Sequence, residues 1–330
     1  ELGYVKIMRT AVVPMLPVSP DIQQNLVLGI LLGLGLGIGG GFVRQSMNWQ
    51  IYEPDDIQDQ GYSLVGVIPK MDREIKKAFE GKPEIDVEGT KLSTTLFPLL
   101  NPWSPITENY RLVRANLRYA AQKDGPAAEA VAQSMIITSP EPGDGKTTTA
   151  VNLATTITLS GRKVLLIDAD MRRPHVHQLL GVERNPGLAE VLSGAASAGE
   201  AIRDTVVDGL SLLTAGTPEI PPTELLDSER MRALLAASTH RYDVVIIDAP
   251  PVLAATDPIV LAPHCDAVLV VASADKTDFR ALSQVKGTLE AVGVSISGVI
   301  FNRYDAEKAR GAYKYGYGYD YTYDYSPTVD

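Results

Sequence analysis

The chain is poor in the features that would assign it to several common classes. It has a single cysteine, Cys265, so no intrachain disulfide can form, and that usage suits a reducing compartment. Cys265 precedes an apolar run and is expected to be a small core residue. Positive charge is not in excess: the formal net charge is -10, without a basic stripe, which argues against nucleic acid as the main partner. The 330 residues, 45% of them apolar, leave room for about two domains with a real core.

Long apolar runs are lacking except at residues 25–43, inside a stretch without charge between Asp21 and Arg44. A helix of about nineteen residues reaches about 28 Å, close to the ~30 Å of a bilayer core, so we predict a transmembrane helix at 23–43. The absence of a basic segment directly before it argues against a cleaved signal peptide. A glycine-rich buried loop is the alternative, but glycines at every fourth position from Gly29 to Gly41 favour close packing of helices in a membrane.

Before this helix, residues 1–22 look like the end of a larger domain, since the chain begins with Glu1 and not Met. After it, residues 44–104 are expected to form a juxtamembrane linker, with one short buried strand at 62–69 and a mobile connector at 70–105. A helix is predicted from Pro105 to about Gln122.

Beyond that helix, apolar runs alternate with helical patterns. This order predicts an α/β fold, a doubly wound, mostly parallel sheet with both faces covered. The expected strands are residues 134–138, 163–168, 210–214, 242–248, 267–272 and 294–301.

The first of these strands leads into a phosphate-binding loop, SPEPGDGKTT at 139–148, and a helix-forming run continues to Leu159. Glycines let the backbone N–H groups face a phosphate, Lys146 can reach the outer phosphates, and Thr147 is placed to ligate magnesium. The strict pattern asks for glycine at 140, where the chain has proline. The expected nucleotide contacts are Gly143, Asp144, Gly145, Lys146, Thr147 and Thr148.

Aspartates end two further strands: Asp168, followed by Asp170, and Asp248. The carboxyl ends of strands in a doubly wound sheet line one crevice, so these carboxylates should converge on a bound phosphate and its metal. Any one of these aspartates could simply cap the helix that follows its strand, but capping does not explain why all three occur in a chain with a phosphate loop.

Tyrosine is concentrated at the end of the chain, where seven of the fourteen tyrosines occupy every second position. The intervening Lys, Gly, Asp and Thr residues weaken a strand, so a mobile tail is favoured over a strand with an aromatic face. A sticky polar-aromatic segment stays open. A nucleotide site together with a row of phenols contains both halves of a tyrosine phosphorylation reaction. The candidate acceptors are Tyr313, Tyr315, Tyr317, Tyr319, Tyr321, Tyr323 and Tyr325.

Three motifs, SPEPGDGKTTT, VLLIDADMRRP and VVIIDAPP, resemble the Walker A, second acidic and Walker B motifs of the bacterial tyrosine kinases. These are membrane polysaccharide co-polymerases with a fused cytoplasmic kinase of the MinD-like ATPase fold, and the resemblance covers nearly the whole chain. Pro14-x-x-Pro17 before the glycine-rich helix and the segment GTPEIPPTELL agree with it. Partitioning ATPases of this fold carry a signature lysine where this chain has Glu141, which counts against that class.

The resemblance implies roles for single residues. Lys146, Asp168 and Asp170 would be catalytic, with Asp168 as the candidate proton acceptor, and Mg²⁺ would be held by Thr147, Asp170 and Asp248. Asn302, with Arg303 beside it, would recognise the adenine of ATP. Taken without the resemblance, Asn302 could equally be a turn asparagine.

Glu108, Arg111 and Arg114 share one helix face, where Glu108 can pair with Arg111. Their spacing alone favours a solvated charged face. The resemblance implies instead a subunit interface that closes into a ring.

The expected protein is an ATP- and Mg²⁺-dependent tyrosine autokinase, with a kinase domain at 105–303 that phosphorylates the 304–330 tail of a neighbouring subunit. It would lie in the bacterial inner membrane, with residues 1–22 periplasmic and the kinase and tail cytoplasmic. It would regulate polymerisation and export of an exopolysaccharide or capsule, with the export and polymerisation machinery and a cognate tyrosine phosphatase as partners. The alternative is a co-polymerase scaffold in which nucleotide binding controls assembly without kinase activity.

Overall fold

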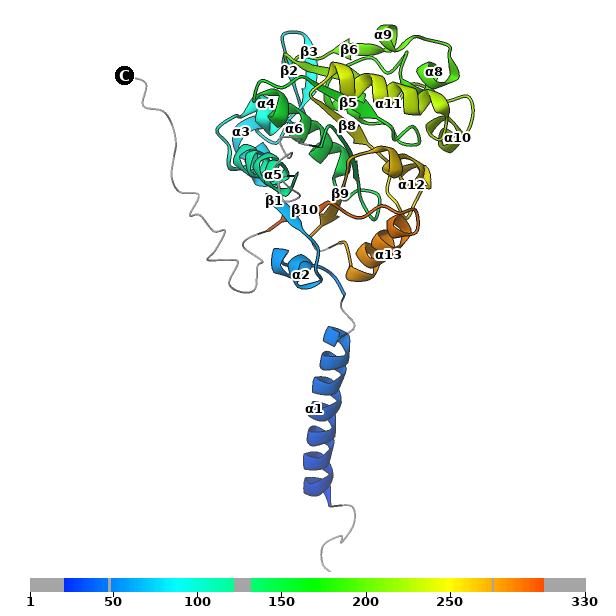
Figure 1. Cartoon of the computed structure of the whole chain (residues 1–330). Coiled ribbons are helices and arrows are strands. Elements are labelled where there is room, and N and C mark those ends of the chain that lie inside the picture. The colour runs from blue at the N-terminus through cyan, green and yellow to red at the C-terminus, as the bar shows by residue number, and fades with distance from the viewer. Residues whose placement is uncertain (1–20, 47–48, 122–131, 275, 306–330) are drawn as a thin grey trace, which may run out of the picture. The chain divides into compact units, whose positions relative to one another are not determined.

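A computed structural model describes residues 21–46, 49–121, 132–274 and 276–305. The chain divides into a small N-terminal unit that ends at Trp49 and a larger unit that begins at Gln50 (Figure 1). The seven tail tyrosines and residues 1–20 lie outside the described residues, so the predictions made for them stay predictions.

The N-terminal unit contains one helix, α1 (Ile22–Ser46), in its described part. The stretch Ile22–Phe42 has a mean hydropathy of 1.8 and is long and apolar enough to cross a membrane. Its large apolar side chains are 55 to 77% exposed. An apolar surface of this size is stable in lipid and costly in water, in accord with the predicted span.

The larger unit is built on an eight-stranded sheet with the order β1-β10-β9-β4-β8-β5-β7-β6. Neighbouring strands pair in parallel except β6 with β7. All six expected strands are present, and the last begins later than predicted, at Gly298. The strands are β1 (Leu64–Pro69), β4 (Ser134–Thr138), β5 (Val164–Asp168), β6 (Ile202–Asp204), β7 (Leu210–Leu213), β8 (Val244–Asp248), β9 (Ala267–Ser273) and β10 (Gly298–Tyr304).

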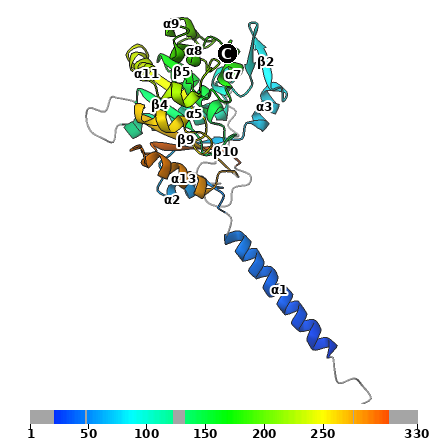
Figure 2. The ribbon, with the colours of Figure 1, turned by 90° about the vertical axis from the view of Figure 1, so that its right-hand side faces the viewer.

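Helices cover both faces of the sheet, as the doubly wound prediction requires (Figures 1 and 2). Alternate side chains of β5 pack into two separate cores. Leu165 and Ile167 belong to the first core, and Val164 and Leu166 belong to the second. The first core packs under α11 (Glu229–Arg241), α12 (Asp257–Leu261) and α13 (Phe279–Glu290); the second packs under α5 (Pro105–Ala121) and α6 (Lys146–Thr158). The shorter helices are α2 (Pro54–Asp59), α3 (Asp72–Phe79), α4 (Phe97–Leu100), α7 (Val176–Leu179), α8 (Leu188–Ser193), α9 (Ala198–Ala201), α10 (Pro222–Leu226) and η2 (Ala262–His264).

The predicted connector at 70–105 is wrong. This stretch holds α3, a hairpin of β2 (Glu84–Val87) and β3 (Thr90–Ser93), and α4, while β1 pairs with β10 at the sheet edge. Leu92 and Phe97 are fully buried, as is Ile51 near the start of the unit. The compact unit therefore begins at residue 50 and not at 105, because apolar side chains scattered through a polar segment still reach the core.

Cys265 is half-buried just before β9, and its Sγ lies 3.5 Å from the carbonyl oxygen of Leu261. Burial, with the nearby Asp266, raises the pKa of its thiol to about 12. The thiol is therefore protonated at neutral pH, in keeping with its expected place as a small core residue.

Gly66 of β1 tests whether the first strand is part of the core. A Cβ at this position would lie 2.4 Å from Cγ2 of Val113 on α5, so Gly66→Val should destabilise the unit by about 1–3 kcal/mol through overpacking. Gly287→Ala on α13 is the control: a Cβ there meets nothing within 4 Å, and the change should stabilise by about 0.5–1 kcal/mol. Thermal unfolding measures both changes. An unchanged unfolding midpoint for Gly66→Val would show that β1 is not packed in the core and belongs to the linker.

Candidate nucleotide site

The phosphate loop connects β4 to α6, which begins at Lys146. Gly143 and Gly145 adopt positive φ angles of 86° and 98°, which side-chain-bearing residues rarely adopt. A Cβ at Gly145 would also lie 2.0 Å from Nδ2 of Asn302. The backbone conformation thus favours glycine at both positions, and close packing against Asn302 requires it at Gly145.

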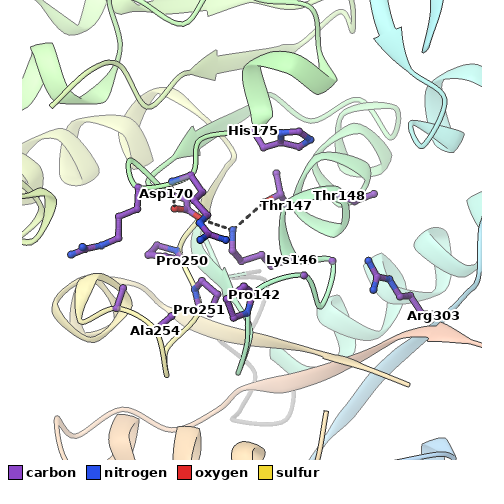
Figure 3. A pocket seen from close by; sticks show the side chains of 15 residues that line it. Pro142, Lys146, Thr147, Thr148, Asp170, His175, Pro250, Pro251, Ala254 and Arg303 are labelled. Atoms are coloured by element: carbon purple, nitrogen blue, oxygen red, sulfur yellow. Dashed lines mark hydrogen bonds and ion pairs between the residues drawn. The ribbon is translucent and has the colours of Figure 1, made fainter. Parts of the chain in front are cut away.

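A cavity of about 530 Å³ lies above this loop (Figure 3). Of the expected nucleotide contacts, Asp144 and Asn302 do not line the cavity and are buried, while the others do line it. The lining residues are Pro142, Gly143, Gly145, Lys146, Thr147, Thr148, Asp170, Arg172, Arg173, His175, Pro250, Pro251, Ala254, Ala255 and Arg303.

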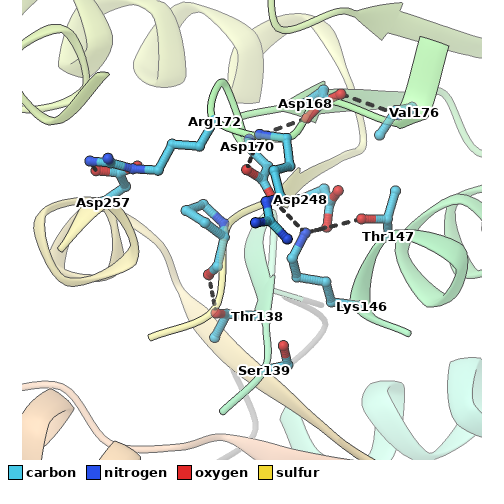
Figure 4. A network of polar contacts seen from close by, with 12 residues as sticks. Thr138, Ser139, Lys146, Thr147, Asp168, Asp170, Arg172, Val176, Asp248 and Asp257 are labelled. Atoms are coloured by element: carbon cyan, nitrogen blue, oxygen red, sulfur yellow. Dashed lines mark hydrogen bonds and ion pairs between the residues drawn. The ribbon is translucent and has the colours of Figure 1, made fainter. Parts of the chain in front are cut away.

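Lys146 is the centre of a buried polar network below the cavity (Figure 4). Its Nζ lies 2.7 Å from Oδ2 of Asp170, 3.1 Å from Oγ1 of Thr147 and 3.7 Å from Oδ1 of Asp248. Burial lowers the pKa of this lysine, but the carboxylates of Asp248 and Asp170 outweigh burial, so the net pKa is raised. Lys146 is therefore held as a cation where a phosphate would bind.

The two aspartates after β5 occupy different positions. Asp170 lines the cavity and accepts a hydrogen bond of 3.0 Å from the backbone N–H of Arg173. Asp168 is fully buried beneath it, and its oxygens accept from the N–H groups of Asp170 at 3.2 Å and Val176 at 3.3 Å. Burial, with the neighbouring Asp248, raises the pKa of Asp168 well above its usual range.

Asp248 fits a magnesium site. It is fully buried, and among the described residues neither carboxylate oxygen has a hydrogen-bond partner, its nearest cation being Lys146 at 3.7 Å. Burial raises the pKa of this carboxyl group. The described residues contain no group of three His, Cys, Asp or Glu side chains suited to a metal. Mg²⁺ here would take its ligands from Thr147, from Asp170 and Asp248 directly or through water, and from the nucleotide, as is usual for this ion.

The loop is also contacted from its outer side. Asn302 of β10 donates to the carbonyl oxygen of Asp144 at 2.9 Å, and Lys276, just after β9, lies 2.7 Å from Oδ1 of Asp144. The sequence prediction missed Lys276, for which the only signal was a lysine directly after a strand. Arg303, next to Asn302, has a φ of 58° and lines the cavity.

The sequence prediction also missed an ion pair beside the cavity, between Asp257 and Arg172, of which Arg172 lines the cavity. Asp257 is fully buried and accepts from Nε of Arg172 at 2.7 Å and from Nη2 at 2.9 Å (Figure 4). Thr223 donates to the same carboxylate at 2.5 Å. Through Thr223 the segment GTPEIPPTELL thus contacts Arg172, which lines the cavity.

The three α5 residues predicted to form the subunit interface are not equivalent. Glu108 and Arg111 form the expected ion pair, with 56% and 34% of their side chains exposed. Arg114 instead donates to the carbonyl oxygen of Thr156 at 2.7 Å, near the end of α6. Part of the predicted interface face is thus engaged within the chain.

Comparison with known proteins matches residues 133–297 to a family model described as an AAA domain. A putative tyrosine-protein kinase EpsB of Ralstonia nicotianae is 34% identical, over 95% of this chain and 40% of its own length. The tyrosine-protein kinase etk of Escherichia coli is 33% identical, over 95% of this chain and 43% of its own length. The chain thus spans about two fifths of the length of these relatives.

Among solved structures, the kinase domain of Escherichia coli tyrosine kinase ETK is similar with a TM-score of 0.70 and 32% identity. The match covers 81% of this chain and all of the ETK domain. Because these relatives are 33 to 34% identical over 95% of this chain, the chain belongs to the bacterial tyrosine kinase family.

Proposed function

We propose that this chain is an ATP- and Mg²⁺-dependent protein tyrosine kinase that phosphorylates the tyrosine-rich tail of neighbouring subunits. The observation that carries the proposal is the convergence of Lys146, Asp170 and Asp248 below a cavity next to a phosphate loop. The same chain carries seven alternating tyrosines after its last strand.

The reaction moves one phosphoryl group. The tyrosine oxygen forms a bond to the γ-phosphorus while the bond from that phosphorus to the β–γ bridging oxygen breaks, and the phenol proton passes to a carboxylate. Lys146 stabilises the negative charge on the transferring group, and catalysis of this kind is mostly positioning and charge stabilisation. Bound Mg²⁺, held at Thr147 and Asp248 with Asp170 beside it, would neutralise charge on the phosphates.

Asp168 is the proposed proton acceptor. A phenol has a pKa of about 10, so it transfers its proton more readily to a carboxylate whose own pKa is raised. Burial raises the pKa of Asp168 well above its usual range, and its position directly below Asp170 puts it next to the cavity wall. Hydrogen bonds of catalytic groups are often completed only when substrate is bound.

Location and partners are part of the proposal. The apolar surface of α1 supports insertion into a bacterial inner membrane, with the kinase and tail on the cytoplasmic side and residues 1–22 on the periplasmic side. The relatives named above are tyrosine kinases, and we assign this chain to the polymerisation and export of an exopolysaccharide or capsule, opposed by a cognate phosphatase.

Phosphorylation would also control assembly. Each phosphotyrosine adds about -1.5 to -2 charges at neutral pH, so modified tails repel one another around a ring. The unphosphorylated form would then assemble and the phosphorylated form dissociate.

Asp168→Asn and Asp248→Asn should separate the proton acceptor from the metal ligand. Both variants should lose at least about a hundredfold in phosphorylation rate, the size usual for removal of a general base or a charge-stabilising group. Magnesium-dependent ATP affinity should fall for Asp248→Asn and hold for Asp168→Asn, because of these two residues only Asp248 is a proposed metal ligand. Titration with nucleotide, with and without Mg²⁺, measures the affinities. If Asp168→Asn kept full activity, Asp168 would not be the proton acceptor and would serve only to order the turn.

Transfer between subunits can be tested by mixing two defective chains. A Lys146→Met chain with an intact tail should be labelled when mixed with an active chain that lacks residues 313–325, because the donor site and the acceptor tail then lie on different subunits. The readout is an anti-phosphotyrosine blot, with each chain alone as the control. Purely intrachain transfer gives no label in the mixture, and a Lys146→Met chain that labels itself would remove the site assignment.

The exposed pair on α5 is proposed to form the subunit interface. Glu108→Ala with Arg111→Ala should weaken assembly roughly tenfold, the effect of losing about 1.4 kcal/mol of contact energy. Autophosphorylation should fall with it. Arg114→Ala is tested separately, because its bond to Thr156 lies within the chain. Sizing in detergent measures assembly, and a double variant that assembles and labels normally would show the pair to be a solvated face.

A further inference from the structure

Lys276 and Asn302 contact the outer side of the phosphate loop, away from the cavity. Lys276 follows β9 and Asn302 lies in the adjacent β10, and the two strands are joined next to the loop by a hydrogen bond of 2.8 Å from Ala274 N–H to the carbonyl oxygen of Asn302. Neither residue lines the cavity. Any effect of theirs on a bound nucleotide must therefore pass through the loop itself.

Their hydrogen bonds fix two peptide planes of the loop. Lys276 Nζ donates to the carbonyl oxygen of Pro142, and Asn302 Nδ2 donates to the carbonyl oxygen of Asp144 at 2.9 Å. In a trans peptide the carbonyl oxygen and the following N–H point in opposite directions. The N–H groups of Gly143 and Gly145 are thus turned away from β9 and β10, and both glycines line the cavity.

Lys276 also compensates a charge that would otherwise oppose phosphate binding. Asp144 is fully buried within the loop; its Oδ1 lies 2.7 Å from Lys276 Nζ, and its Oδ2 accepts from the N–H of Glu141 at 3.0 Å. A buried carboxylate without a cation would repel an anion bound to the same loop. The lysine and the aspartate together add no net charge there.

The residue after Lys276 is tied to two other parts of the fold. The neighbouring Thr277 is 1% exposed, and its hydroxyl accepts from the N–H of Ser273 at 2.8 Å. The carbonyl oxygen of Thr277 accepts from the N–H of Ile51 at 3.1 Å, and Ile51 is fully buried. Thr277 is therefore tied both to β9 and to the first residues of the compact unit, which fixes the backbone next to Lys276.

We propose that Lys276 and Asn302 are positioning residues that aim the N–H groups of Gly143 and Gly145 at the phosphates of the nucleotide. Lys276 acts through the Pro142 carbonyl and Asp144, and Asn302 through the Asp144 carbonyl. The proposal deepens the function above and rests on it for the identity of the nucleotide, but it concerns binding and not phosphoryl transfer.

The test is affinity for a fluorescent ATP analogue, measured on the full chain in detergent together with the midpoint of thermal unfolding. Lys276→Ala should weaken binding roughly tenfold, the size of one charge-assisted hydrogen bond, with the midpoint little changed. Lys276→Arg should recover part of the loss. Lys82→Ala is the matched control, because that lysine pairs with Glu80 on the surface and should leave affinity unchanged. Should Lys276→Ala not fold, Lys276→Gln takes its place.

Asn302→Ala is measured with ATP and GTP analogues. An equal loss for both nucleotides supports positioning of the loop, whereas a loss for ATP alone assigns Asn302 to adenine and overturns its half of the proposal. A Lys276 variant that lowers the unfolding midpoint and keeps its affinity overturns the other half, since it shows a structural role. Failure of the kinase assay in the wild-type chain, with these affinity changes intact, would count against the proposed function alone.

Discussion

A lysine held as a cation among buried carboxylates is the interaction on which the rest of this structure depends. Lys146 lies 2.7 Å from Asp170 and 3.7 Å from Asp248, with Asp168 directly below. Charges buried in this way are stable only when their partners are fixed in place. The fold fixes them by register: Asp168 and Asp248 are partners across the paired strands β5 and β8, and β4, which carries the phosphate loop, pairs with β8 on its other side. Asp168 and Asp248 thus lie near Lys146 because the carboxyl ends of β4, β5 and β8 are aligned in register.

The remaining elements support this centre from several sides. Arg172 lines the cavity and is held by the buried Asp257, with Thr223 bound to the same carboxylate. Strands β9 and β10 bring Lys276 and Asn302 to the back of the loop. Residues near the N-terminal end of the unit contribute too, since Ile51 binds the turn that carries Lys276. The site is therefore assembled from most of the length of the compact unit.

The elements that sequence could predict are those with a local signal. Continuous apolar runs that end in aspartate predicted β5 and β8, and the glycine pattern predicted the phosphate loop, because each depends on neighbouring residues. The segment from 70 to 105 could not be read this way, since Leu92 and Phe97 are buried by partners far away in sequence. Lys276 and Asp257 were missed for the same reason: their partners, Asp144 and Arg172, are more than eighty residues distant. Asn302 was predicted to be a site residue. Its hydrogen bond to the loop was not predicted, because the placement of β10 against the loop has no local signal in the sequence.

The central claim is that this site transfers phosphoryl groups to tyrosines of the same protein. Intact-mass spectrometry of the full chain, before and after incubation with ATP and Mg²⁺, tests it most directly because it counts the groups added. We expect a ladder of mass increments of one phosphate each, located in residues 313–325 and abolished in the Lys146→Met chain. An unchanged mass in a wild-type chain that binds ATP normally would contradict it, and would favour a scaffold in which the nucleotide only controls assembly.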